Sequence, residues 1–144
     1  LYGIKSVALR YFNVFGEGQE NANGGGDSSL CLANFLKQYK NREPLTINGD
    51  GEQRRDFVYV KDVVEANIKA VEYLDKAKQF EAFNIGLGIN YSINEVADMI
   101  KKERIYLQPR IEPKVCLADI TKAKEILHWF PTIDLKDWIK QQIG

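Results

Sequence analysis

Short apolar runs and longer amphipathic segments alternate along the chain, and the two kinds of segment predict strands and helices respectively. The apolar runs are rich in β-branched and aromatic residues and end at glycine or polar residues, which is typical of buried strands. They predict strands at residues 7–12, 45–47, 57–60, 82–86 and 115–117. A turn rich in glycine, asparagine and aspartate at residues 48–51 separates the second strand from the third.

The amphipathic segments place apolar residues at helical spacing, and several of them begin with side chains that cap helices. Residues 62–65 and 92–95 each have the spacing of a capping box, in which two side chains satisfy the first backbone N–H groups of a helix. Asp119 and Asp134 are expected to cap the last two helices. The predicted helices cover residues 30–39, 62–74, 92–103, 120–127 and 134–139.

Strands and helices are interleaved, so the expected fold class is α/β or α+β. The polar, glycine-rich stretch at residues 17–29 predicts a mobile loop between the first strand and the first helix. At 144 residues, with 44% hydrophobic and 11% aromatic residues, the chain is about one domain long and can bury a core.

Charge and cysteine content exclude several classes of partner and site. The 20 basic and 20 acidic side chains balance, so we expect no nucleic-acid or membrane partner, although a local anion site stays open. Two isolated cysteines and a single histidine predict neither a disulfide framework nor a metal site, which favours a reducing, cytoplasmic location. The chain begins at Leu1 without an initiator Met or a signal-peptide pattern, so we expect it to be part of a longer protein.

The sequence holds no complete catalytic constellation, and we assign no catalytic residue. A dinucleotide loop needs glycines at G-x-G-x-x-G spacing, so that the backbone can approach a pyrophosphate. The glycine pairs at residues 16–18, 49–51 and 86–88 each lack the third glycine. The sequence also has no P-loop and no arrangement of Ser, His and Asp for nucleophilic catalysis.

Arginine and asparagine side chains near strand ends are the candidates for ligand binding. Arg55 follows the turn at residues 48–51 and enters a strand, where its guanidinium is suited to bidentate binding of a phosphate. Strand alternation sends Arg54 to the opposite face, and Arg110 is a second candidate for the same diphosphate. Asn13 ends the first predicted strand and is suited to orienting sugar hydroxyls. The alternatives are a solvated hairpin in which Arg55 pairs with a carboxylate, and a turn-capping role for Asn13.

Four sequence blocks, in this order, resemble the extended short-chain dehydrogenase/reductases that act on nucleotide sugars. They are LRYFNVFG at residues 9–16, PLTINGDGEQRRDFVYVKDVVEAN at 44–67, FNIGLG at 83–88, and ADITKA at 118–123 with the tryptophan–proline end at 129–131. The resemblance covers nearly the whole chain. It is strongest to UDP-glucose and UDP-N-acetylglucosamine 4-epimerases, since phenylalanine follows Asp56 where dTDP-glucose dehydratases more often carry tryptophan.

The resemblance implies the C-terminal α/β substrate-binding domain of such an enzyme, plus one late strand of its Rossmann sheet. Residues 1–16 would be the residual strand of the NAD-binding Rossmann domain, and residues 17–144 the nucleotide-sugar domain. The family's N-terminal Rossmann half, with its glycine-rich NAD loop, Ser/Thr and Tyr-x-x-x-Lys pair, would precede Leu1. Tyr2 and Lys5 stand one residue too close together to be that pair.

The resemblance also implies binding residues, but no catalytic or metal-binding ones. The substrate-binding residues are Asn13 at the phosphates or the sugar, Leu45 and Ile47 beside the base, and Arg55 and Arg110 as diphosphate-binding arginines. The cofactor-binding residues, beside the nicotinamide and the sugar, are Tyr11 and Phe12. The family usually has Arg-x-Gly-Asp/Glu where this chain has RIEP at residues 110–113, one residue shorter.

The implied function is NAD-dependent 4-epimerisation of UDP-glucose or UDP-N-acetylglucosamine by the whole protein, a homodimer paired through the preceding half. The 144 residues alone are expected to be inactive. Within the family, a nucleotide-sugar 4,6-dehydratase and an ADP-heptose epimerase are the alternatives. Outside it, a non-catalytic nucleotide-sugar-binding module and a structural or interaction domain are the alternatives. The sugar and the base stay open.

Overall fold

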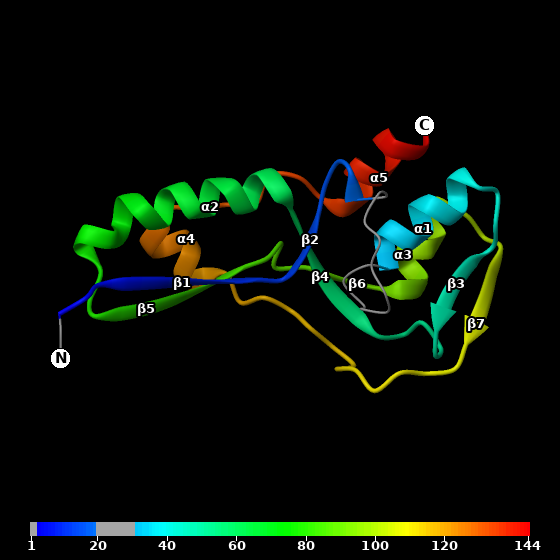
Figure 1. The fold of residues 1–144 in the computed structure, drawn as a ribbon, viewed down its shortest axis with the longest axis horizontal. Helices are drawn as coiled ribbons and strands as arrows, with labels where there is room; N and C mark the ends of the chain where they lie inside the picture. The colour runs from blue at the N-terminus through cyan, green and yellow to red at the C-terminus, as the bar shows by residue number, and fades with distance from the viewer. Residues whose placement is uncertain (1–2, 20–30) are drawn as a thin grey trace.

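Two lobes of helices and parallel strands lie at opposite ends of an elongated molecule, joined by one long strand (Figure 1). The computed structural model describes residues 3–19 and 31–144. Most of the loop predicted at residues 17–29 therefore lies outside the described part of the chain. The α/β class with parallel strands is confirmed.

The first lobe is built on a parallel pair of strands, β1 (Ser6–Tyr11) and β5 (Phe80–Ile85). Helices α2 (Val60–Tyr73) and α4 (Thr121–Leu127) lie on the same side of this pair, and a short 3-10 helix (Leu74–Lys76) follows α2 (Figure 1). The buried core between them includes Phe83 and Trp129. The expected domain boundary after residue 16 stays a prediction.

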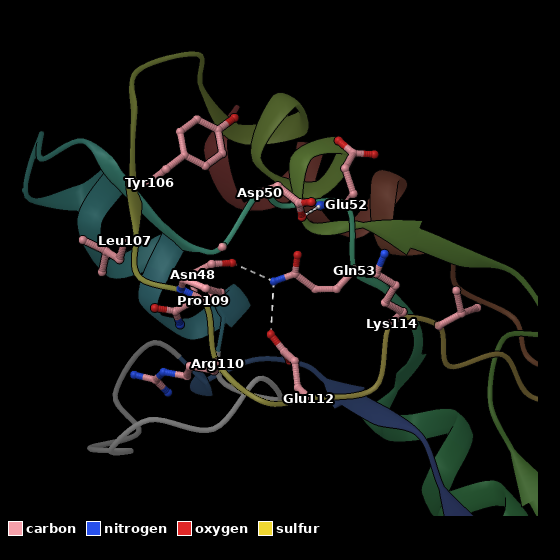
Figure 2. Close-up of a pocket in the computed structure, with 12 residues that line it drawn as sticks. Asn48, Asp50, Glu52, Gln53, Tyr106, Leu107, Pro109, Arg110, Glu112 and Lys114 are labelled. Carbon is pink, nitrogen blue, oxygen red and sulfur yellow. Dashed lines mark hydrogen bonds between the residues drawn. The ribbon is translucent and has the colours of Figure 1, made fainter.

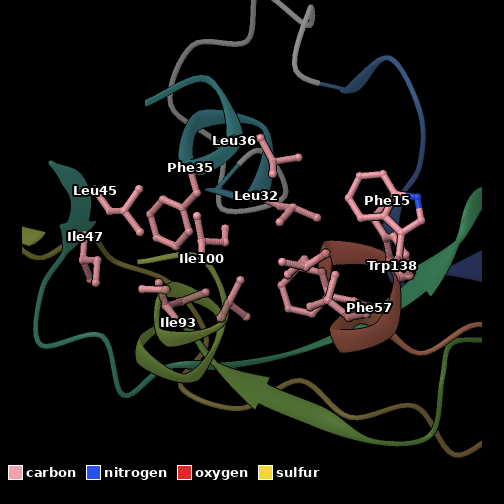
Figure 3. Packing of buried hydrophobic residues seen from close by; sticks show 14 of the residues in the cluster. Phe15, Leu32, Phe35, Leu36, Leu45, Ile47, Phe57, Ile93, Ile100 and Trp138 are labelled. Atoms are coloured by element: carbon pink, nitrogen blue, oxygen red, sulfur yellow. The ribbon is translucent and has the colours of Figure 1, made fainter. Parts of the chain in front are cut away.

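The second lobe packs three helices against another parallel pair. The helices are α1 (Cys31–Lys40), α3 (Ile93–Ile100) and α5 (Leu135–Ile143), and the strands are β3 (Leu45–Asn48) and β7 (Arg104–Leu107). Figure 3 shows the core of this lobe, in which Phe35 from α1 and Trp138 from α5 are fully buried.

A three-stranded sheet in the order β2–β4–β6 connects the lobes. Its strands are β2 (Asn13–Phe15), β4 (Arg54–Tyr59) and β6 (Asn90–Ser92). Side chains of β4 alternate between the two cores, because Phe57 packs in the second lobe and Val58 in the first. Every residue of β4 after Arg54 is buried, so this strand fixes the relation between the lobes.

Two of the four expected helix caps are confirmed. Ser92 and Glu95 form the reciprocal capping box of α3, and Asp134 accepts a hydrogen bond from the Lys136 backbone N–H at the start of α5. The box at residues 62–65 is wrong, because α2 already begins at Val60 after Tyr59. The carboxylate of Asp62 is buried instead, where it accepts hydrogen bonds from Thr132 and Ile133.

The cap at Asp119 is displaced by one residue. Helix α4 begins at Thr121 after Ile120, which makes no side-chain capping bond, although the Asp119 carboxylate accepts from the Thr121 backbone N–H at 3.0 Å. The strand predicted at residues 115–117 is reduced to a single bridge between Val115 and Arg54. No helix among residues 3–19 and 31–144 combines the length and the apolar character that crossing a bilayer requires.

Candidate functional site

Arg55 lies at the start of β4 and is almost completely buried, with 2% of the residue's surface exposed. One guanidinium nitrogen, Nη2, lies 2.5 Å from Glu112 Oε2, and Nη1 donates to the Arg54 carbonyl at 2.8 Å. A buried charge needs such partners, because an isolated one is costly to remove from water. The structure therefore pairs Arg55 with a carboxylate, but in a buried site and not in a solvated hairpin.

Arg54 points to the other face of the strand, as alternation predicts. Its guanidinium donates to the side-chain and backbone oxygens of Asn90, each at 2.9 Å, and lies 2.9 Å from Glu95 Oε2. Glu95 is also half of the capping box of α3, so Arg54 supports that helix. The two neighbouring arginines thus have different surroundings and different tasks.

Residues 108–116, here called the strap, cross the start of β4. One end of the strap adjoins β7, where the Gly49 N–H donates to the Leu107 carbonyl at 3.0 Å. The other end is fixed to Arg54 by two backbone bonds, from the Arg54 N–H to Lys114 and from the Cys116 N–H to Arg54. The strap brings Glu112, which is remote in sequence, to Arg55, and it also carries Arg110.

A pocket of about 900 Å³ lies between the strap and the turn that joins β3 to β4 (Figure 2). Its walls combine the apolar side chains of Tyr106, Leu107 and Pro109 with polar groups. Gln53 spans it, donating to Glu112 Oε1 at 3.1 Å and to the Asn48 carbonyl at 3.0 Å. Arg110 also lines this pocket, and in Figure 2 its guanidinium points away from Gln53.

Asn13 shares a face of the sheet with Arg55. It is the first residue of β2 and lies opposite Phe57 in the parallel pair with β4. Arg55 stands two residues before Phe57 on the same strand, so the side chains of Asn13 and Arg55 project from the same side. Of the predicted substrate residues, Asn13 and Arg55 thus share one sheet face, and Arg110 lies on the strap that crosses the start of β4.

Leu45 and Ile47 do not lie on this sheet face. Both side chains are buried in the core of the second lobe, at 0% and 1% exposure. Thr46, between them, points the other way and exchanges hydrogen bonds with the Gln38 amide. A ligand beside β3 would therefore meet its backbone or Thr46, while Leu45 and Ile47 hold the strand against the core.

Tyr11 and Phe12 lie at the junction of β1 and β2. Tyr11 ends β1 with 47% of its surface exposed, and its hydroxyl donates to Asn67 Oδ1 on α2 at 2.9 Å. Phe12 packs against the core of the first lobe. Their carboxyl-terminal position on a parallel strand is one where ligands bind in α/β sheets.

Asp56 is a second buried charge beside Arg55, and it organises the backbone around the site. Its carboxylate accepts hydrogen bonds from the N–H groups of Leu87, Gly88 and Ala118 at 2.6, 2.9 and 3.1 Å. Burial raises the pKa of Asp56 above its ordinary value, while these three donors oppose the shift. Three of the four blocks that carry the family resemblance therefore meet at one carboxylate.

Two groups of the kinds that act as nucleophiles or bases have raised pKa values here. Burial raises the pKa of the Cys31 thiol to about 12, so it is protonated near neutral pH. The Tyr59 hydroxyl donates to Glu17 at 2.7 Å, and this bond raises the pKa of Tyr59 and lowers that of Glu17. In the described residues, no three His, Cys, Asp or Glu side chains lie close enough to hold a metal ion.

Sequence reasoning missed Glu112, Gln53 and the role of Asp56. Glu112 pairs with Arg55, 57 positions earlier in the chain, and no local sequence pattern predicts a contact at that separation. A signal was available in the acidic residue that follows the second candidate arginine, which is Glu112 in the RIEP stretch at residues 110–113. For Asp56, the signal was an acidic residue within a strand that is otherwise apolar.

The chain matches one protein family and several solved structures. The sequence profile of the NAD dependent epimerase/dehydratase family matches residues 1–86. The curated "Putative UDP-glucose 4-epimerase" of Methanocaldococcus jannaschii is 44% identical over 152 aligned residues, which cover 100% of this chain and 46% of the relative.

Two crystal structures are similar in both sequence and fold. UDP-glucose 4-epimerase from Thermotoga maritima, solved with UDP-glucose, is 36% identical with a TM-score of 0.83, over 99% of this chain and 46% of that one. UDP-glucuronic acid 4-epimerase from Bacillus cereus, solved with UDP-glucuronic acid and NAD, is 32% identical with a TM-score of 0.77, over 95% and 43%. The chain spans about half the length of these relatives.

Proposed function

Because the chain belongs to the NAD dependent epimerase/dehydratase family, we propose that it serves in a nucleotide-sugar 4-epimerase of the UDP-glucose or UDP-N-acetylglucosamine type. The observation that carries the proposal is the buried guanidinium of Arg55, which shares its sheet face with Asn13 and lies beneath the strap that holds Arg110. Two arginines and an amide, supplied by this sheet face and by the strap, suit a diphosphate joined to a sugar. The names of the similar structures support the same class of substrate.

The residues of this chain divide the binding task in a way that suits epimerisation. A 4-epimerase must present both faces of C4 to one hydride site, so the sugar has to turn while its carrier stays fixed. Arg55 and Arg110 would anchor the diphosphate, and Asn13 would orient the phosphates or the sugar. Binding energy from a remote group of this kind can serve catalysis at the reacting carbon. Leu45 and Ile47 would act from the core by positioning β3 beside the base.

Tyr11 and Phe12 fit the edge of an NAD site. Tyr11 is half-exposed at the carboxyl end of a parallel strand, the edge at which nicotinamide cofactors bind in doubly wound sheets. NAD, when bound, supplies the hydride exchange at C4. We infer that the glycine loop, the Tyr-x-x-x-Lys pair and the homodimer contact belong to the preceding half, and that the protein is cytoplasmic.

The test is to incubate the full-length protein and NAD with UDP-glucose and, separately, UDP-N-acetylglucosamine, and to identify the products by NMR. Formation of the corresponding galacto-configured nucleotide sugar is the expected result. A 4-keto-6-deoxy product would instead show a 4,6-dehydratase. Saturable binding of nucleotide sugar without turnover would show a binding module. The absence of both binding and turnover would refute the proposal.

A further inference from the structure

Arg55 reaches the ligand-binding face with its guanidinium already engaged. Nη2 donates to Glu112, and Nη1 donates to the Arg54 carbonyl. In this ion pair the Arg55 side chain is 3% exposed and the Glu112 side chain 18% exposed. Because the Arg55 side chain is almost fully buried, a phosphate reaches its guanidinium only when a group that covers it moves, and Glu112 is the partly exposed side chain bonded to it.

We propose that Glu112 is a latch, which holds Arg55 and closes the strap until an anionic ligand takes the place of its carboxylate. This inference rests on the function proposed above, because it takes Arg55 to be the diphosphate anchor. It assigns Glu112 the role of an internal competitor for that anchor. No contact between Glu112 and the ligand is required.

The strap is arranged so that such an exchange stays local. Its two ends are fixed by backbone bonds, from Gly49 to Leu107 on one side and between Arg54 and Lys114 on the other. Between them, Pro109 and Pro113 flank the residues that would move, and each proline restricts the backbone at its own position because its φ is fixed.

Gln53 offers Glu112 a place to remain when Arg55 is taken. Its amide donates to Glu112 Oε1, the oxygen that does not bond Arg55, and it is itself held by the Asn48 carbonyl. On release from Arg55, the carboxylate keeps this neutral partner and gains exposure to water. Once the anionic ligand pairs with Arg55, neither charge lacks a partner, whereas opening without a ligand leaves the buried guanidinium without its carboxylate and is therefore rare.

The energetic consequence is a reduced apparent affinity for every ligand that needs Arg55. When only a fraction of the molecules is open, the measured dissociation constant equals the intrinsic one divided by that fraction. An open fraction of about one tenth or less corresponds to a tenfold or larger weakening. A ligand that does not use Arg55, such as a nucleoside, is not weakened.

The experiment compares Glu112→Gln, Glu112→Ala and the wild type in the full-length protein. Calorimetric titrations use UDP, pyrophosphate and uridine as probes, and hydrogen exchange of the amides at residues 110–112 is followed without ligand. The control is Glu125→Gln, which removes the same charge from the exposed face of α4 in the other lobe. We expect both Glu112 variants to bind UDP and pyrophosphate about tenfold more tightly or better, to bind uridine as before, and to exchange faster in the strap.

Each other outcome has a defined meaning. Unchanged or weaker UDP binding by both Glu112 variants overturns the latch. Tighter binding with unchanged strap exchange also overturns it, since charge repulsion alone would then explain the gain. If no variant binds UDP but the Glu112 variants gain pyrophosphate binding and strap exchange, the latch stands and the proposed nucleotide-sugar function fails. If they gain neither, both fail.

Discussion

Replacing Arg55 by alanine tests the site most directly, because Arg54 provides a matched control on the same strand. Arg55→Ala removes the only guanidinium that β4 points toward the face with Asn13 and the strap. A hydrogen bond to a charged group contributes about 1.5–3 kcal/mol. The full-length variant should therefore bind UDP about 10- to 150-fold more weakly than the wild type.

Arg54→Ala should leave UDP affinity within about twofold of the wild type, because its guanidinium bonds Asn90 and Glu95 on the opposite face. It should instead lower the free energy of unfolding by about 1 kcal/mol or more, since it loses bonds to Asn90 and to the α3 capping box. Isothermal titration with UDP and urea denaturation measure the two quantities separately. Equal losses of affinity, or a larger loss for Arg54→Ala, would refute the assignment of Arg55.

Arg55→Ala also removes the ion-pair partner of Glu112, so weaker binding by this variant could reflect lost stability. Arg55→Lys separates the two effects. Arg55→Ala leaves the mostly buried Glu112 carboxylate without its cation, which is destabilising for a buried pair. Arg55→Lys keeps the positive charge but not the forked geometry of arginine. It should remain folded and still bind UDP more weakly than the wild type. Unchanged affinity in Arg55→Lys would mean that bidentate binding plays no part.

The remaining predictions concern stability and the chain by itself. Asp56→Asn should cost about 2–4 kcal/mol of unfolding free energy, because its amide nitrogen faces backbone donors, whereas the exposed Asp137→Asn should cost little. Gly86→Ala should cost about 1–3 kcal/mol, since its Cβ would lie 2.4 Å from a side-chain carbon. The Tyr73 hydroxyl and a backbone N–H hold the pKa of Glu81 below its usual 4.5. The stability lead of the wild type over Glu81→Gln should therefore be complete above that pH and disappear as pH falls through the lowered pKa, as thermal melts between about pH 3 and 6 would show. The 144 residues alone should not interconvert UDP-glucose and UDP-galactose, and turnover by the purified chain with NAD would contradict this.

The sequence predicted the helices well because their signals are local. Apolar spacing and the Ser92–Glu95 box lie within a few positions of one another, and all the predicted helices are present. The helix cap predicted at Asp62 was wrong. Its spacing to Glu65 is that of a capping box, but its carboxylate instead accepts a hydrogen bond from Thr132, 70 positions away. Such a partner leaves no trace near Asp62 in the sequence.

For the strands and the site as well, features set by neighbouring residues could be predicted, and features set by distant residues could not. Strands β2 and β6 have three residues each, too few for a period-two pattern to be seen. Alternation along β4 did separate Arg54 from Arg55, because that rule needs only neighbouring residues. The partner of Arg55 could not be predicted, because Glu112 reaches it only when the strap crosses β4.

The carboxylate of Asp56 also has a consequence for the order in which the chain folds. Its three donors follow it by 31, 32 and 62 positions, so they can converge only after two long segments have closed into loops. Contacts with such sequence separation require costly loop closure and slow the folding of the chain. We predict that the bonds to Asp56 form after the transition state. A change at Asp56 should therefore act mainly on the unfolding rate and leave the refolding rate nearly as it was. The feature that joins three distant blocks of sequence would then determine how long the native state lasts more than how quickly it is reached.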